Sequence, residues 1–344
     1  MRFCYVGHKF HKKTRSTVFL LDHLKSLGTV EEYLSSPDED DASDDALVSK
    51  LAASDFDVYV FLQTEYIAER CKSFGLGRFI LVPMYDGAVG REGSFWRQFA
   101  DDLFISFSST HHEELQRLQC RSAYFQFFPE PLKTKPLNFE EPLRAFFWER
   151  LPGREPSLQT VLKLCKQMNI QSLHVHAAPD SGTSAASRLQ WPEQFTIGEM
   201  SVTISRWFPN REDLAPIMNQ AHFNFAPRPL EGIGMSFLEA MARGQIVVAP
   251  DQPTMNEYIR HQTNGLLYDL SQPSVGQPLS TEKLASISAA AVRTIRVGHD
   301  RWHRDQTRLS SLLLDDGRRW STKDYSSHFR NEIRKKASFR AQNA

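Results

Sequence analysis

Short apolar runs alternate along the chain with longer segments whose apolar residues recur at helical spacing. In the first part of the chain, the runs that predict strands are residues 2–6, 57–62, 79–82, 103–106 and 124–128. In the second part they are residues 145–148, 172–175, 202–205, 222–226 and 245–249. The segments between them carry helical stripes, such as Leu20, Leu21, Leu24 and Leu27. This alternation predicts an α/β protein with parallel sheets.

A proline-rich segment separates the two series of strands. It contains Pro129, Pro131, Pro136 and Pro142, and prolines of this density are typical of a linker between domains. A chain of 344 residues is long enough for two hydrophobic cores. We therefore expect a first domain over residues 1–135 and a second over 142–317, each built like a Rossmann fold.

Hydroxyl residues and histidines at the predicted helix starts give further expectations. Ser16, Ser109 or Thr110, and Thr281 are the expected N-caps of three helices. His111 and His112 are adjacent and point to different faces, so they do not form the pair of ligands that a metal site on one helix face requires. We expect both histidines at the surface.

Composition excludes some classes of protein. Lys plus Arg and Asp plus Glu both number 41, so the net charge gives no indication of a nucleic-acid partner. Four cysteines occur without any C-x-x-C pair, which predicts free thiols in a reducing compartment. The first residues begin directly as a strand, and no apolar run is long enough to cross a membrane. We therefore expect a soluble, cytoplasmic protein.

The segment from Asn224 to Asp269 carries the most specific chemistry. It predicts a strand, a turn with two glycines, a helix over residues 235–243, and a second strand. The first amides of a helix have no partner within it and lie at the positive end of its dipole, so they suit a phosphate group. The candidate amides for a diphosphate are those of Gly232, Ile233, Gly234, Met235 and Ser236.

Two glutamates flank these amides. Glu231 precedes the helix, and Glu239 lies about one turn into it. A carboxylate beside a phosphate would be repelled, so we expect both to accept hydrogen bonds from sugar or ribose hydroxyls. Donors for a diphosphate next to acceptors for two sugars predict a nucleotide-sugar site, at the strand ends where open α/β sheets bind ligands.

The same segment resembles the E-x7-E region of the retaining glycosyltransferases of family 4, or group 1 glycosyltransferases. The similarity includes Glu231 and Glu239, the following Ala-Met-Ala-Arg-Gly and Val-Val-Ala-Pro, and residues 264–269. It implies the GT-B fold, in which two Rossmann-like domains face each other across a cleft and a C-terminal helix, here residues 318–340, crosses back to the first domain. It also implies hexosyl transfer with retention, from a UDP- or GDP-linked sugar, as in polysaccharide biosynthesis.

The resemblance assigns further residues on the donor side. Arg150 and Arg154 match the pair of cations that neutralises the departing diphosphate, and arginine suits forked hydrogen bonds to phosphate. Arg206 begins a loop that borders the nucleotide base in the family. Trp207 and Phe208 in this loop are candidates to border the base, but core packing is the more common position of such aromatics, and we favour it.

On the acceptor side, residues 7–16 form a predicted basic loop. Its candidates for acceptor binding are His8, Lys9 and His11, and a solvated basic loop explains them equally well. After the strand over 79–82, many family members carry a histidine that contacts the transferring sugar. Tyr85 and Asp86 stand there instead. Asp86 is the candidate acceptor-side base or orienting group, although a turn residue before Gly87 is an alternative.

These residues predict a mechanism that needs no metal or other cofactor, with Glu231, Arg150, Arg154 and Asp86 around the reacting atoms. The acceptor is a glycan, a lipid-linked sugar or a small molecule, and the basic C-terminal residues are compatible with peripheral contact with anionic lipid. Three alternatives remain open: a non-catalytic sugar-binding or partner subunit, a nucleotide-sugar epimerase of related fold, and a glycoside hydrolase.

Overall fold

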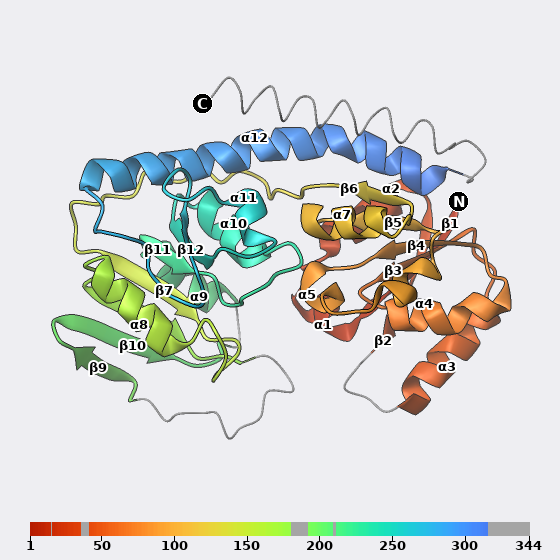
Figure 1. Ribbon diagram of the computed structural model, residues 1–344, viewed down its shortest axis with the longest axis horizontal. Helices are drawn as coiled ribbons and strands as arrows, with labels where there is room; N and C mark the ends of the chain where they lie inside the picture. The colour runs from red at the N-terminus through yellow and green to blue at the C-terminus, as the bar shows by residue number, and fades with distance from the viewer. Residues whose placement is uncertain (15, 36–40, 180–191, 209–210, 316–344) are drawn as a thin grey trace. The chain divides into compact units, whose positions relative to one another are not determined.

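The first sheet contains six parallel strands. The computed structural model describes residues 1–14, 16–35, 41–179, 192–208 and 211–315, and the residues up to Arg304 form one compact unit (Figure 1). The strands are β1 (Arg2–His8), β2 (Thr29–Ser35), β3 (Val58–Leu62), β4 (Arg78–Val82), β5 (Leu103–Ser106) and β6 (Ser122–Tyr124). Their order is β2-β1-β3-β4-β5-β6, so this sheet presents the carboxyl ends of all its strands at one edge.

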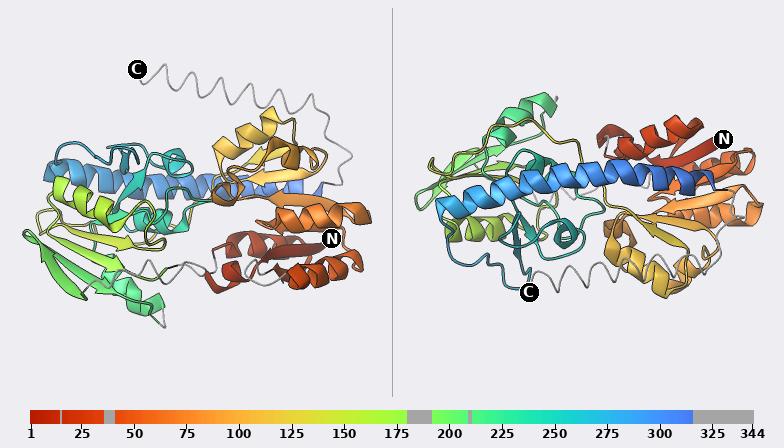
Figure 2. Two further views of the ribbon diagram at one scale, coloured as in Figure 1. Left: turned by 60° about the horizontal axis from the view of Figure 1, so that its bottom comes forward. Right: turned by 90° about the horizontal axis from the view of Figure 1, so that it is seen from above.

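Helices follow β1 to β5 and cover both faces of this sheet (Figures 1 and 2). They are α1 (Lys9–Thr14), α2 (Val18–Leu27), α3 (Asp41–Ala52), α4 (Glu65–Cys71), α5 (Tyr85–Ala88), α6 (Gly93–Arg97) and α7 (Ser109–Arg117). One core joins the strands to α3, α4 and α7 through buried residues such as Leu51, Ile67 and Leu115. Burial of these apolar side chains is the main stabilising term for the domain.

The second sheet is parallel except at one edge. Its strands are β7 (Arg144–Trp148), β8 (Ser172–His176), β9 (Gln194–Ile197), β10 (Met200–Ser205), β11 (Phe223–Phe225), β12 (Ile246–Pro250) and β13 (Leu266–Tyr268), in the order β13-β12-β11-β7-β8-β10-β9. Only the β9–β10 pair is antiparallel among the described strands of this sheet. Because β11 lies between β12 and β7 in this order, the turn that follows it lies between the ends of neighbouring strands.

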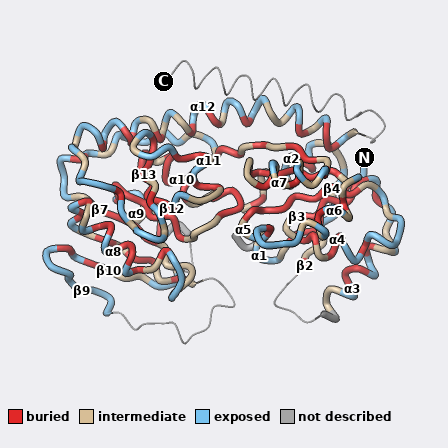
Figure 3. Tube along the Cα trace, in the orientation of Figure 1, coloured by how far each residue is buried: buried red, intermediate tan, exposed pale blue. Residues whose placement is uncertain are grey.

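Helices cover both faces of the second sheet as well. They are α8 (Leu158–Gln167), α9 (Arg211–Asn219), α10 (Met235–Ala242), α11 (Met255–Tyr258) and α12 (Thr281–Leu314). Ala145 and Phe147 belong to the core that includes α8 and the start of α12, whereas Phe146 between them packs with Leu214 of α9. This alternation follows from the period of two in a strand, and both sheets are buried along their centres (Figure 3).

Trp302 of α12 packs against aromatic side chains that belong to the first sheet's region. Its ring makes edge contacts with Phe19, Phe107, Phe125 and Phe127, at centroid distances of 5.7, 6.1, 6.5 and 5.6 Å. Only 2% of Trp302 is exposed. The sequence predicts a helix over part of α12 but not its full extent, and the predicted final helix over 318–340 lies outside the described residues.

Several local predictions are wrong. The predicted basic loop is the short helix α1, because Lys9–Thr14 continues directly from β1. The N-cap of each of three helices lies one residue from its predicted position. Thr17 precedes α2 and makes no side-chain capping hydrogen bond. Before α7, the Ser108 hydroxyl accepts a hydrogen bond from the His111 amide, and before α12, the Ser280 hydroxyl accepts one from the Lys283 amide. The predicted strand over 124–128 is β6, which ends at Tyr124.

Candidate functional site

The start of α10 has the geometry that the two glycines predict. Gly234 is the N-cap residue and has a left-handed backbone with φ of 82°. A Cβ atom there would lie 1.8 Å from Cε1 of Phe237, and one on Gly232 would lie 2.7 Å from Cβ of Met84. Neither position accepts a side chain, so the amides at the start of α10 stay bare and close to the β4–α5 segment.

The two glutamates lie on either side of this helix start. Glu231 is buried, and its carbonyl oxygen accepts a hydrogen bond of 3.1 Å from the Thr254 hydroxyl. Glu239 is half-buried one turn into α10, where its carboxylate lies 3.5 Å from Nη2 of Arg243. The backbone of Glu231 is therefore anchored, and Glu239 has a cation one helical turn away.

The Asp86 carboxylate accepts hydrogen bonds from donors in two different segments of the chain. Nη1 of Arg228, in the segment after β11, lies 2.9 Å from its Oδ2, and the amide of Gly87 donates to its Oδ1 over 3.1 Å. Burial raises the pKa of Asp86, while the charges of Arg228 and Arg150 and the Gly87 hydrogen bond act in the opposite direction. Burial is the largest of these effects, so the pKa of Asp86 lies above its usual value, and the donors around it partly offset this rise by stabilising the carboxylate.

The two predicted arginines lie in different surroundings. Arg150 is half-buried after β7, with its guanidinium 5.2 Å from the ring centroid of Trp148, and it acts electrostatically on Asp86. Arg154 is exposed, and its amide donates to the carbonyl of Leu151 over 3.0 Å. The structure therefore brings Arg150 into electrostatic interaction with Asp86, whereas Arg154 is exposed.

The predicted acceptor residues divide in the same way. Nε2 of His8 lies 2.7 Å from the carbonyl oxygen of Gln63, and Nε2 of His11 lies 2.5 Å from Oε1 of the same residue. Burial lowers the pKa of His11 to about 4, against the opposing effect of the Gln63 hydrogen bond. Lys9 is exposed on α1. The two histidines thus belong to one polar network around Gln63.

The aromatic residues after β10 do not share one position. Phe208 stacks on His176 with a centroid distance of 5.5 Å and packs against the core near Phe146, as the core interpretation predicts. Trp207 is 61% exposed, so core packing is wrong for it. Arg206 is exposed beside it. An exposed tryptophan next to an arginine leaves the base-binding prediction for this loop open.

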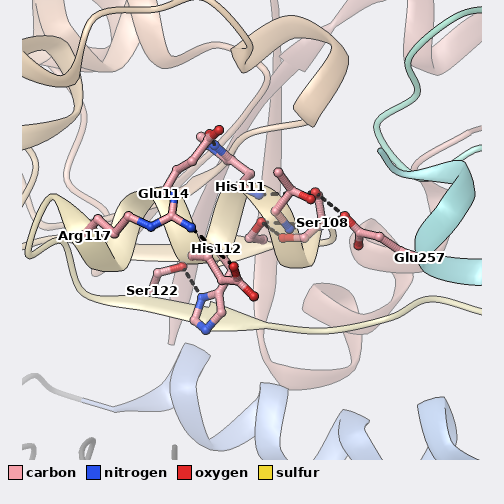
Figure 4. Close-up of polar contacts among 10 residues, drawn as sticks. Ser108, His111, His112, Glu114, Arg117, Ser122 and Glu257 are labelled. Carbon is pink, nitrogen blue, oxygen red and sulfur yellow. Dashed lines mark hydrogen bonds and ion pairs between the residues drawn. The ribbon is translucent and has the colours of Figure 1, made fainter. Parts of the chain in front are cut away.

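Glu257 of α11 caps a helix of the first sheet's region. Its carboxylate accepts hydrogen bonds from the Ser108 hydroxyl over 2.8 Å, the Ser109 amide over 2.7 Å and the Thr110 amide over 3.2 Å (Figure 4). These groups are at the N-terminus of α7, where a negative charge is stabilised. These hydrogen bonds connect α11, which follows β12, to α7, which follows β5.

The histidines of α7 are not the surface residues that the sequence predicts. His111 is 1% exposed, with its ring 5.1 Å from that of Trp96 and its Nδ1 3.2 Å from the carboxylate of Glu114 (Figure 4). His112 is half-buried and lies 2.8 Å from the Ser122 hydroxyl. The prediction fails because α7 packs against α6 at His111 and against β6 at His112.

Sequence reasoning missed Gln63, Arg228 and Glu257. Each contacts residues more than fifty positions away along the chain, so no local spacing reveals it. The segment of Arg228 did carry a signal, because a charged residue lies between Pro227 and Pro229 at the end of a predicted strand. Among the residues that the structure describes, no cluster of three His, Cys, Asp or Glu side chains is arranged to hold a metal ion. No described helix has the length and apolar character to span a bilayer.

The sequence of the second sheet's region matches a known family. The family model described as glycosyl transferases group 1 covers residues 157–275. Residues 157–275 are therefore similar in sequence to a group 1 glycosyltransferase domain. This range includes Arg228, Glu231, the start of α10 and Glu257. No curated protein matches the sequence.

Solved structures of similar fold cover most of the chain. The lipopolysaccharide outer core galactosyltransferase WaaB in its apo form has a TM-score of 0.59 at 14% identity, covering 90% of this chain and 99% of its own. HepE from Anabaena in complex with UDP and glucose has a TM-score of 0.56 at 13% identity, with 90% and 100% covered. Trehalose-6-phosphate synthase OtsA has a TM-score of 0.62 at 13% identity, with 92% and 99% covered. Together with the two sheets, these matches confirm the predicted GT-B architecture.

Proposed function

We propose that the protein is a retaining glycosyltransferase, which moves a hexosyl group from a UDP- or GDP-linked sugar to a hydroxyl of a glycan, lipid-linked or small-molecule acceptor. The observation that carries this proposal is the bare helix start at Gly234, inside a group 1 glycosyltransferase domain and beside two glutamates. The presence of UDP and glucose in HepE, a protein of similar fold, supports a nucleotide-sugar donor.

The mechanism is electrostatic. As the glycosidic bond loosens, negative charge grows on the diphosphate, and the amides at the start of α10 together with Arg150 stabilise it. Glu231 holds hydroxyls of the transferred sugar and Glu239 holds the ribose. Arg154 extends the cationic side of the site from solvent. This charge stabilisation by protein groups alone makes the transfer independent of a metal ion.

On the acceptor side, Asp86 orients the attacking hydroxyl and accepts its proton. Its Oδ1 lies 3.1 Å from the position that a Cβ atom on Gly232 would occupy, so the carboxylate borders the loop that leads into α10. His8, His11 and Lys9 hold the remainder of the acceptor. The acceptor site is thus assigned to the carboxyl edge of the first sheet, where α/β proteins bind ligands.

Product analysis tests this proposal. The protein is incubated with UDP-glucose, UDP-galactose or GDP-mannose and a panel of sugar acceptors, with and without EDTA, and the anomeric configuration of the product is determined by NMR. We expect retention, no effect of EDTA, and a loss of about 100-fold in kcat for Arg150→Ala. Arg296→Ala, an exposed residue of α12, is the control. Inversion of configuration, or product formation without any nucleotide sugar, would refute the proposal.

The alternatives give different results in the same experiment. An epimerase converts the donor sugar when no acceptor is present. A sugar-binding partner subunit binds the donor but yields no product with any acceptor. A glycoside hydrolase releases sugar from a glycoside without a nucleotide donor.

A further inference from the structure

Gln63 lies at the carboxyl end of β3 with a left-handed backbone, at φ of 53°. Four described residues other than glycine have positive φ. Gln119 and Asn169 follow the C-termini of α7 and α8, and Gln262 lies in the turn of the His261–Gly265 bridge. Left-handed residues are common after helices. Gln63 instead joins a buried parallel strand to α4, so the strain there has no helix end to explain it.

The backbone at Gln63 directs three hydrogen bonds from one residue toward the predicted site. Its carbonyl oxygen bonds Nε2 of His8, its Oε1 bonds Nε2 of His11, and its Nε2 donates to Oδ1 of Asp86 over 3.4 Å. Its amide donates to the carbonyl of Val82 at the end of β4 over 3.2 Å. Gln63 therefore contacts three of the residues that the sequence assigns to the acceptor side.

The chemistry of these partners fixes the orientation of the Gln63 carboxamide. Asp86 already accepts from Arg228 and from the Gly87 amide, so its carboxylate presents only acceptor atoms to Gln63. The NH2 group of Gln63 must face Asp86, and its oxygen must face His11. The opposite orientation would place two acceptors 3.4 Å apart.

The protonation of the two histidines follows from this orientation. Because Oε1 and the backbone carbonyl of Gln63 are acceptors, Nε2 of both His8 and His11 must carry a proton. Nδ1 of His11 lies 2.9 Å from the Ser16 hydroxyl. In the neutral ring with a proton on Nε2, this Nδ1 accepts a hydrogen bond from the Ser16 hydroxyl. Gln63 thus selects one tautomer for each histidine.

We propose that Gln63 is a positioning residue for glycosyl transfer, which holds the Asp86 carboxylate toward the helix start at Gly234 and fixes the Nε2–H tautomers of His8 and His11. This inference rests on the proposed function. Gln63 touches no reacting atom. It acts by joining the end of β1, the β4–α5 segment and, through the Asp86–Arg228 ion pair, the donor side of the site.

Variants at Gln63 separate this role from backbone strain. Gln63→Gly relieves the left-handed backbone but removes the carboxamide, and we expect kcat to fall at least about tenfold while the Kd for the nucleoside diphosphate is unchanged. Gln119 also has a positive φ, of 61°, and it is an exposed residue after the end of α7. Gln119→Gly is therefore the matched control, and we expect it to keep the wild-type kcat.

Gln63→Glu tests the hydrogen-bond orientation itself. It keeps an acceptor toward His11 but sets a carboxylate against Asp86, so both the histidine and the aspartate gain a negative neighbour. We expect the pKa of His11, measured by NMR titration of the ring, to rise from its lowered value near 4. His11→Gln identifies the His11 signal by its absence.

Two results would overturn the inference. One is a wild-type ring with the proton on Nδ1 of His11, seen in the nitrogen chemical shifts. The other is wild-type kcat in both Gln63→Gly and Gln63→Glu. If the proposed function fails, no variant has activity to lose, but the NMR measurement still tests the tautomers. The outcomes for the function and for Gln63 are therefore distinguishable.

Discussion

Glu65 allows a quantitative prediction for a buried carboxyl group. It is the first residue of α4, it is 4% exposed, and its Oε1 has no hydrogen-bond partner among the described residues. Burial raises the pKa of Glu65 from 4.5 to about 7; the charge of Arg91 acts against this rise and that of Asp86 adds to it. The folded state therefore keeps a proton that the unfolded state releases.

The sign of the pH effect follows from this difference in bound protons. Between pH 4.5 and about 7 the folded state binds more protons at Glu65 than the unfolded state, so the free energy of unfolding decreases as pH rises through this window. Above pH 7, the difference between the pKa of Glu65 in the unfolded state and its pKa in the folded state lowers the free energy of unfolding by about 3 kcal/mol. Glu65→Gln keeps the shape of the side chain and removes the charge.

We expect Glu65→Gln to unfold at the same urea concentration as the wild type at pH 4.5. At pH 8 we expect it to be more stable by up to about 3 kcal/mol. Glu69→Gln is the control, since Glu69 is exposed on the same helix. An equal effect of Glu65→Gln at both pH values, or no gain at pH 8, would refute the assignment of a buried protonated carboxyl.

Three further variants test the packing around the site. Glu257→Ala removes the acceptor of the Ser109 amide, and we expect urea denaturation to show a loss of about 1–2 kcal/mol, with wild-type stability as the contradicting result. Gly234→Ala forces a methyl group onto Phe237, and we expect calorimetry to detect no nucleotide binding; unchanged affinity would contradict the backbone geometry. Trp302→Ala leaves a cavity among four aromatic rings, and we expect thermal unfolding to show a loss of about 3–5 kcal/mol. A loss below 1 kcal/mol would show that the ring is not packed as described.

The α/β architecture was predictable because buried parallel strands are continuous apolar runs. Val58–Leu62 is buried at every position, and its composition alone indicates a strand. The edge strands β2 and β9 were missed because they pair with neighbours on one side only and are largely exposed. The sequence Thr-Val-Glu-Glu-Tyr-Leu-Ser of β2 has too few apolar residues to predict a strand.

The geometry of the candidate site was predictable only where it depends on residues close in sequence. Gly232, Gly234, Glu231 and Glu239 are close in sequence, so their spacing indicates a helix start with flanking carboxylates. Gln63 has no such signal, because its hydrogen bonds reach residues at or beyond the carboxyl ends of β1 and β4. Long-range polar contacts depend on how strands are ordered in the sheet, and a single sequence does not contain that order.

Calorimetric titration with UDP and GDP tests the central claim most directly. If the start of α10 and Arg150 bind a diphosphate, one of the two nucleotides will bind the wild-type protein, with unchanged affinity in EDTA. Arg150→Ala will then bind it less tightly, and Arg296→Ala will bind it as the wild type does. Absence of binding by both nucleotides, or equal affinity in all three proteins, would contradict the account.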